Sequence, residues 1–223
     1  MKKTDVLSYV DAMTLRLSGT PDFDVEVQDD GSGIIQVRSR NYPNTAATFD
    51  LERNRVTASS GSRLGAGALN ELLNNDVLVK NAAYLINGSI YVRTDALGRP
   101  YRFRVNYNRS WTVAHTGRPS RDLPKNDGDQ IGHVIAAALC GPHERFNIVP
   151  MPEDYNKGWY LFQEQMLAGA LAKMRDSPEN WFLDLRIDVS YDGPSLRPDA
   201  LHLEAELDNA AGYYAHLSSE CVY

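Results

Sequence analysis

Hydrophobic positions in the first 60 residues follow two different spacings. From residue 5 to 17 apolar side chains recur at roughly helical intervals, whereas later segments alternate apolar and polar residues between Gly, Asn and Asp turns. These alternating segments are 24–27, 33–39, 47–51 and 55–59. The pattern predicts one helix followed by short strands, which is a small α+β unit.

A change in composition interrupts this pattern at residues 58–67, where the sequence reads ASSGSRLGAG. Ser and Gly at this density favour a loop, and a short helical segment follows at 68–75. We therefore predict a domain boundary here. It separates an accessory α+β region at 1–75, to which the sequence assigns no function, from a larger domain at 76–223.

The larger domain begins with a predicted β-hairpin. Residues 77–86 and 89–94 flank Asn87-Gly88, a dipeptide suited to the positive φ angles of a tight turn. Further strands are predicted at 100–107, 182–191 and 200–207. Residues 156–174 have the periodicity of a long helix, with a predicted buried stripe of Trp159, Phe162, Met166, Leu167, Ala170 and Leu171. The fold class is α+β with an antiparallel sheet.

Charge changes this picture through its position along the chain. The net charge of −6 argues against a nucleic-acid partner, because phosphate binding is driven by Lys and Arg. However, residues 176–223 carry −8, whereas residues 76–175 carry +4. The acidic C-terminal part leaves open a DNA-mimicking inhibitor, and the basic middle part indicates a local phosphate-binding patch.

The basic side chains concentrate between residues 93 and 125. Alternation along the strand at 100–107 places Arg102 and Arg104 on one face, and Arg109 follows shortly after the strand. These three arginines are the candidate nucleic-acid-binding residues. The alternative is that they form an ordinary solvated strand face.

Three polar residues are spaced so that a strand, strand, helix unit could bring them together. His133 starts an apolar run, Asn156 starts the predicted helix and Glu164 lies about two turns further along it. Hydrolysis of a phosphodiester bond needs a base to deprotonate water, which an imidazole supplies near neutral pH. It also needs a cation, and amide and carboxylate oxygens suit Mg²⁺. Asn156 could instead serve as the helix N-cap.

The segments around these residues carry several short motifs in a fixed order. They are DQIGHVIA at 129–136, GP at 141–142, FNIVP at 146–150, NKGW at 156–159 and then Glu164, with YLINGSIYVRTDALGRP at 84–100 and VSYDGPSLRPD at 189–199 further out. Together they resemble the DNA/RNA non-specific endonucleases, most closely the bacterial toxin-type branch. The resemblance covers about residues 76–208.

The resemblance implies a ββα-metal (His-Me finger) core. In that core His133 is the general base, Asn156 is a direct metal ligand and Glu164 holds the water shell of the metal. Asn147 is then a supporting residue that fixes the hairpin. Lys157, beside the presumed ligand, is a candidate phosphate contact in the presence of substrate.

The sequence departs from the family just before the histidine. The family has an Asp three residues before the base, where this chain has Gln130, so Asp129 or Asp127 is expected to take over its orienting role. A phosphate-binding Arg is missing there too. One of the three candidate arginines would have to supply the cation that steadies the transition state.

We therefore expect an endonuclease dependent on Mg²⁺ or Mn²⁺ that cuts DNA, RNA or both with little sequence preference. The resemblance to toxin-type nucleases suggests an antibacterial effector with an immunity protein as partner. The alternative is a catalytically silent nucleic-acid-binding or interaction module of the same fold. No apolar signal region or membrane span is visible, which predicts a protein that is cytoplasmic or exported by a specialised secretion system.

Overall fold

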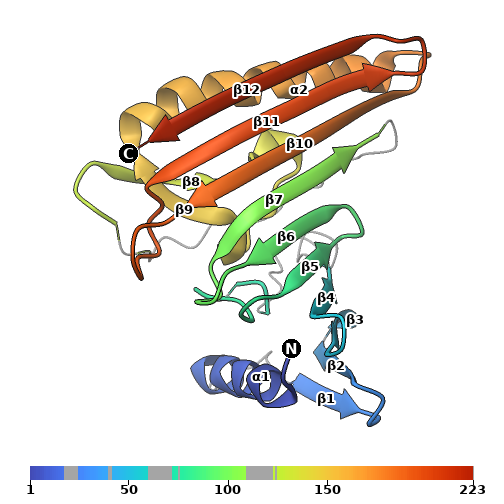
Figure 1. Ribbon diagram of the computed structural model, residues 1–223, viewed down its shortest axis with the longest axis vertical. Helices are drawn as coiled ribbons and strands as arrows, with labels where there is room; N and C mark the ends of the chain where they lie inside the picture. Colours follow the sequence, from blue (N-terminus) through green and yellow to red (C-terminus); the bar gives the residue numbers. More distant parts are fainter. Residues whose placement is uncertain are drawn as a thin grey trace.

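A computed structural model of the chain describes residues 1–17, 25–39, 42–59, 72–74, 76–108, 123 and 125–222. One large sheet with the strand order β1-β2-β3-β4-β5-β6-β7-β10-β11-β12 dominates the molecule, and β8 and β9 form a separate hairpin (Figure 1). The helices are α1 (Lys3–Leu17) and α2 (Leu161–Asp176). The strands are β1 (Val25–Asp29), β2 (Ile34–Ser39), β3 (Tyr42–Asp50), β4 (Arg55–Ala58), β5 (Ala83–Ile86), β6 (Ile90–Thr94), β7 (Pro100–Tyr107), β8 (Asp129–His133), β9 (Ile148–Pro152), β10 (Trp181–Ser190), β11 (Ala200–Asn209) and β12 (Tyr214–Val222).

The sheet is continuous across the boundary predicted at residue 75. β4 pairs with β5 in parallel, and all the other neighbouring strands of the sheet are antiparallel. Helix α1 packs against the N-terminal strands, because Val6 and Val10 are buried in the same core as Ile35 and Val37. The accessory region therefore shares its sheet with the larger domain, and its status as a separate folding unit stays a prediction.

The predicted hairpin turn is present between β5 and β6. Asn87 and Gly88 have φ angles of 55° and 73°, which is the left-handed region that a tight hairpin turn requires. Strand β5 starts at Ala83, later than predicted, because the residues before it form turns. Asn81 there has a φ of 51°.

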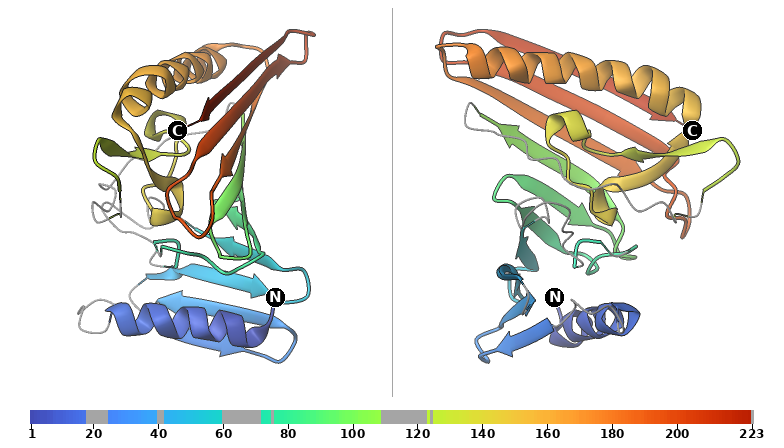
Figure 2. Two further views of the ribbon diagram at one scale, coloured as in Figure 1. Left: turned by 60° about the vertical axis from the view of Figure 1, so that its left-hand side comes forward. Right: turned by 180° about the vertical axis from the view of Figure 1, so that it is seen from behind.

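The two faces of the sheet have different roles. On β7 the inward side chains contact the segment between β8 and β9: Phe103 stacks on Phe146, and the Tyr107 hydroxyl donates to the Leu139 carbonyl at 2.6 Å. Arg102 and Arg104 alternate with them and point to the other face. Figure 2 shows α2 and the β8–β9 hairpin on the same side of the sheet. We call this side the inner face.

The long helix matches its predicted buried stripe only in part, because Leu167 is buried as predicted and Met166 is not. It is preceded by a π-helical turn, η4 (Tyr155–Tyr160), in which Tyr160 is buried, and the buried positions of α2 include Gln163, Leu167 and Met174. Met166, predicted to be buried, is 42% exposed. The side chains of Trp159 and Phe162 lie outside the described part. Within the described ranges, no helix combines the length and hydrophobicity needed to cross a membrane.

Candidate functional site

His133 is the last residue of β8, where the hairpin meets the core. β8 pairs with β9 so that Gly132 lies opposite Val149 and His133 opposite Ile148. His133 is half-buried, and the residues that follow it are buried. The Val134 amide donates to the Asn147 carbonyl at 2.8 Å. The backbone that carries the imidazole is therefore fixed on both sides.

Asn156 lies within the π-helical turn that precedes α2. Its Nδ2 donates to Oε1 of Gln130 on β8 at 3.3 Å. The alternative reading as a helix N-cap is wrong, because the N-cap of this turn is Asp154 and Asn156 lies inside it. A single π turn in a helix is rare and is often found at functional sites. Here it directs the candidate ligand toward the strand that ends at His133.

The residue before His133 is in close contact with Asn156. A Cβ built on Gly132 would lie 2.7 Å from Asn156 Oδ1 and 2.6 Å from the sulfur of Met151. Only glycine leaves room for this approach. The amide oxygen of Asn156 is thus placed beside the backbone of Gly132, next to His133 in the chain.

Glu164 lies in the first turn of α2 and is half-buried. Burial raises the pKa of its carboxyl from 4.5 to about 7. The pKa of the Tyr155 hydroxyl, beside Asn156, is raised by burial first and by Cys221 second. The charge of Glu164 raises it further, so Glu164 lies near Tyr155. Among the described residues, the Glu164 carboxylate has no hydrogen bond or ion pair. A bound cation would favour its charged form.

Asn147 is fully buried and joins three points of the loop after β8. Its Nδ2 donates to the carbonyls of Ile135 and Pro142 at 2.9 Å each, and its Oδ1 accepts from the Ile135 amide at 2.8 Å. The Asn147 amide therefore uses both its donors and its acceptor to hold the backbone, as expected for a supporting residue rather than a ligand.

His143 is a neighbour of His133 to which the sequence analysis assigned no role. Nδ1 of His143 lies 2.9 Å from Nε2 of His133. The two residues are ten positions apart and no motif spacing relates them. The only sequence signal is the Gly141-Pro142 pair before His143, which indicates a turn that could bring the chain back.

Comparison with known proteins identifies the family to which this chain belongs. The profile of the DNA/RNA non-specific endonucleases matches residues 80–209, which is more than half of the chain. The chain belongs to this family. Membership supports a nuclease activity, and the matched range contains His133, Asn147, Asn156 and Glu164.

Two solved structures are similar to part of this chain. One, described as an extracellular endonuclease, is 19% identical with a TM-score of 0.37, and the match covers 57% of this chain and 64% of that one. The other, described as an extracellular nuclease, is 18% identical with a TM-score of 0.38, and the match covers 57% of this chain and 72% of that one.

Asp129, one of the two carboxylates expected to orient His133, has another partner. Asp129 accepts from Arg197 Nε at 2.7 Å and from Nη2 at 2.9 Å. The Arg197 guanidinium holds the pKa of the Asp129 carboxyl below its usual range. Asp129 and His133 are four residues apart on one strand, which is about 13 Å and beyond hydrogen-bonding reach. The pair ties the start of β8 to the loop between β10 and β11.

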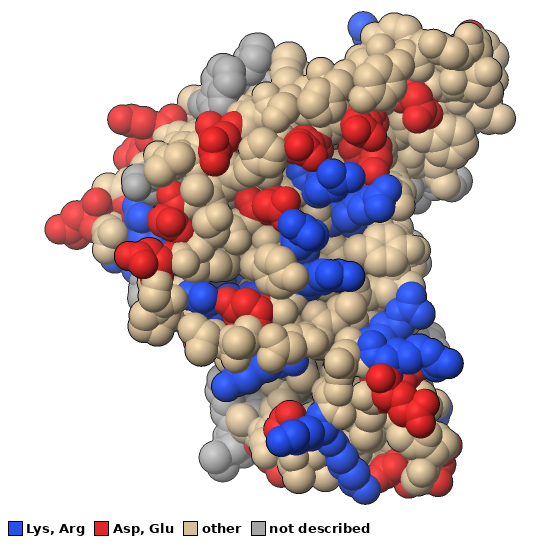
Figure 3. Space-filling model, viewed as in Figure 1, with Lys and Arg blue, Asp and Glu red and all other residues tan. Residues whose placement is uncertain are grey.

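The strand arginines Arg102 and Arg104 lie on the outer face of the sheet. Arg102 pairs with Asp188 at 2.6 Å and Arg104 with Asp184 at 2.7 Å. Figure 3 shows Lys and Arg interleaved with Asp and Glu on this face. The sheet therefore separates both arginines from the β8–β9 hairpin. Lys157, which is exposed, pairs with Glu153, and Arg109 lies outside the described residues.

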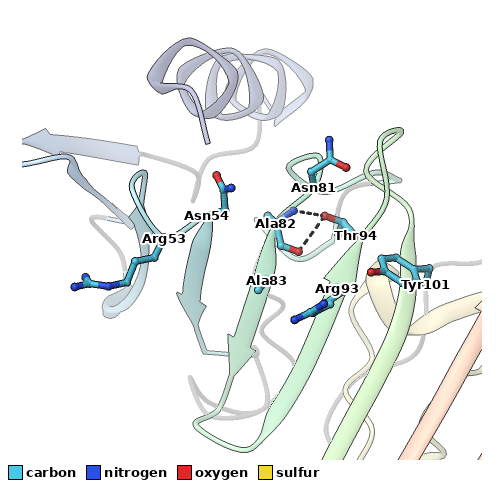
Figure 4. A pocket seen from close by; sticks show the side chains of 8 residues that line it. All are labelled: Arg53, Asn54, Asn81, Ala82, Ala83, Arg93, Thr94 and Tyr101. Atoms are coloured by element: carbon cyan, nitrogen blue, oxygen red, sulfur yellow. Dashed lines mark hydrogen bonds between the residues drawn. The ribbon is translucent and has the colours of Figure 1, made fainter.

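Two cavities lie away from His133, Asn156 and Glu164. One, of about 300 Å³, opens beside β4, β5 and β6 (Figure 4). It is lined by Arg53, Asn54, Asn81, Ala82, Ala83, Arg93, Thr94 and Tyr101. The other, of about 590 Å³, is lined by Lys125, Asn126, Asp192, Ser195, Leu196, Arg197, Pro198 and Asp199. Neither lining includes His133, Asn156 or Glu164, so hydrogen bonds and donor chemistry define the candidate site.

Proposed function

We propose that this chain hydrolyses phosphodiester bonds of DNA, RNA or both, in the presence of Mg²⁺ or Mn²⁺ and with little sequence preference. The close approach of Asn156 Oδ1 to Gly132 carries the proposal, because it joins the candidate metal ligand to the residue before the candidate base. Membership of the non-specific endonuclease family supports it. The elements concerned follow the order strand, strand, helix of a ββα-metal core.

In this proposal His133 is the general base. A ring nitrogen accepts a proton from water, and the resulting hydroxide attacks the phosphorus of the scissile bond. The fixed backbone on either side of His133 limits the positions that the ring can take. Asn147 supports this arrangement through its three hydrogen bonds to the loop.

The donor set fits a hard divalent cation. Asn156 offers an amide oxygen, and Glu164 offers a half-buried carboxylate with no other partner among the described residues. In the described part of the chain, no group of three or more His, Cys, Asp and Glu could hold a metal. The protein would thus provide few ligands, as Mg²⁺ with its retained waters allows. When bound, such a cation neutralises charge that develops on the phosphate oxygens.

Substrate binding is proposed to rest on phosphate contacts, which carry no sequence information. Lys157 is the neighbour of Asn156 in the chain, and we expect it to contact a phosphate once it leaves Glu153. Arg102 and Arg104 would contact nucleic acid only along the outer face, and Arg109 completes the candidate set. The antibacterial role, the immunity protein and the export route stay predictions from the sequence resemblance.

The experiment is a digestion of plasmid DNA and of RNA with Mg²⁺, Mn²⁺ or EDTA. We expect cleavage by the wild type only with metal, and a loss of about a hundredfold or more in His133→Ala. Asn156→Ser should lose most of its activity and recover part of it as Mg²⁺ is raised, because the shorter hydroxyl offers a poorer ligand, whereas His133→Ala should not respond. Asn106→Ser, on the exposed face of β7, is the matched control.

Thermal melts of each variant show whether it is folded. Cleavage by His133→Ala at the wild-type rate, or cleavage that EDTA does not affect, would remove the proposed mechanism. A folded wild type that cuts neither polymer with either metal would favour the catalytically silent module.

A further inference from the structure

His133 and His143 face each other across the loop that follows β8. Nε2 of His133 lies 2.9 Å from Nδ1 of His143, with the ring centroids 5.0 Å apart and the ring planes at 70°. At this distance one ring donates its N–H to the other. The two imidazoles therefore share one proton in a hydrogen bond.

The loop between the two histidines is held in place. Asn147 binds both Ile135, two residues after His133, and the carbonyl of Pro142, directly before His143. A Cβ on Gly141 would lie 1.7 Å from the Ile135 carbonyl oxygen, so the two sides of the loop are in direct contact. The facing of the two rings is thus a consequence of a tightly hydrogen-bonded backbone.

We propose that His143 is a positioning residue whose Nδ1 accepts the Nε2 proton of His133, so that His133 presents Nδ1 as the base. This inference rests on the proposed function, in which His133 takes a proton from water. The opposite direction of the bond would put the ring proton of His133 on Nδ1 and use the lone pair of Nε2, leaving no basic nitrogen. Only one of the two tautomers is therefore competent.

The same hydrogen bond stabilises His133 after the proton transfer. Once Nδ1 has taken the proton from water, the imidazole is a cation, and its Nε2–H donates a charge-assisted bond to neutral His143. A base oriented by a third group is a recurring arrangement, and the third group is often a carboxylate. Here Asp129 is bound to Arg197, and His143 takes the orienting position.

The test uses two substitutions of His143 that differ in one property. In His143→Asn the amide oxygen occupies nearly the place of Nδ1 and keeps an acceptor, whereas His143→Leu has similar bulk and no acceptor. On plasmid DNA we expect kcat to fall about tenfold to a hundredfold in His143→Leu, with KM within about twofold, and to recover largely in His143→Asn. His216→Leu, on β12 away from the site, is the matched control.

Nitrogen-15 NMR of the imidazole rings in the full chain gives a second readout that does not depend on cleavage. His133 should carry its proton on Nε2 in the wild type and in His143→Asn, and should become a mixture of tautomers in His143→Leu. If the wild type cleaved no nucleic acid, the proposed function would fail, whereas the tautomer would still decide the direction of the bond.

Three results would overturn the inference. The first is a wild-type His133 protonated on Nδ1. The second is a His143→Leu variant with the kcat of the wild type. The third is a His143→Asn variant that melts like the wild type and is nevertheless as slow as His143→Leu, because a restored acceptor would then not restore the rate.

Discussion

The side-chain oxygen of Asn156 lies so close to the backbone of Gly132 that a Cβ at position 132 would come within 2.7 Å of it. The same Cβ would lie 2.6 Å from two atoms of Met151. Met151 is flexible and can shift. Asn156 can shift only by changing its hydrogen bond to Gln130. The size of residue 132 therefore determines where the candidate ligand lies.

Gly132→Ala should displace Asn156, lowering cleavage by about tenfold or more and stability by about 1–3 kcal/mol through overpacking. The measurements are kcat with varied Mg²⁺ and urea unfolding. Gly169→Ala is the matched control, because a Cβ there meets nothing within 4 Å and the position is helical. It should keep its activity and gain up to about 1 kcal/mol. Equal activity of both variants would contradict the assigned role of residue 132.

Gln130→Leu should weaken metal binding by about tenfold to a hundredfold, because Nδ2 of Asn156 loses its acceptor and the amide can rotate. Gln130→Glu keeps an oxygen at this position and should stay close to the wild type. The measurement is the Mg²⁺ concentration at half-maximal cleavage rate for each variant. If Gln130→Leu needs no more Mg²⁺ than the wild type, Gln130 does not orient Asn156.

Glu164 predicts a specific pH dependence of stability without metal. Its folded pKa is raised to about 7, so its contribution is fully present below the unfolded pKa of about 4.3 and is lost as pH rises through about 7. From pH 5 to 8 in EDTA, the wild type should lose on the order of 1 kcal/mol relative to Glu164→Gln, which stays neutral.

The same pair of proteins tests the cation. At pH 8, Mg²⁺ should raise the melting temperature of the wild type more than that of Glu164→Gln, because only the wild type offers a carboxylate. If the melting temperatures of the two proteins changed equally with pH, both in EDTA and in Mg²⁺, Glu164 would not be a titrating group of the metal site.

The outer face can be tested by the salt dependence of DNA binding. If Arg102 and Arg104 both contact phosphate, replacing both with Gln should reduce the slope of log K against log salt by up to about two. Their ion pairs with Asp188 and Asp184 will make the change smaller. An unchanged slope would mean that nucleic acid does not bind along β7.

Local chemistry made parts of the fold predictable from the sequence. The Asn87-Gly88 turn depends only on which residues tolerate positive φ, and the structure confirms it. Alternation likewise placed Arg102 and Arg104 on one face of β7. It could not tell which face carries the hairpin, because that depends on what packs there, and the outer position of these arginines followed only from the tertiary structure.

The helix shows where periodicity misleads. The spacing of apolar residues predicted both Met166 and Leu167 in the buried stripe, but only Leu167 is buried and Met166 is exposed. The π turn at Tyr155–Tyr160 lies before both residues, which belong to one continuous helix, so their different burial depends on what packs against α2. The helix propensities of the residues do not predict this π turn. The turn contains Asn156, whose side chain donates a hydrogen bond to Gln130.

The candidate site divides in a similar way. His133, Asn156 and Glu164 follow from motif order and chemistry, and the structure places Asn156 against the residue before His133. The partners His143 and Arg197 could not be predicted. His143 reaches His133 because the loop after β8 closes back on itself. Arg197 reaches Asp129 over a sequence separation of 68 residues. Such contacts depend on the fold as a whole.

The parallel pairing of β4 with β5 has a consequence for dissecting the chain. If the chain were cut at residue 75, β5 would lose its only partner on that side, and the edge of Ala83–Ile86 would be left open. This strand is short and apolar, and Tyr84 and Ile86 are buried in the intact chain. Open, apolar edges pair readily with other chains. The N-terminal strands thus cover the edge of β5, and a fragment without them would tend to aggregate.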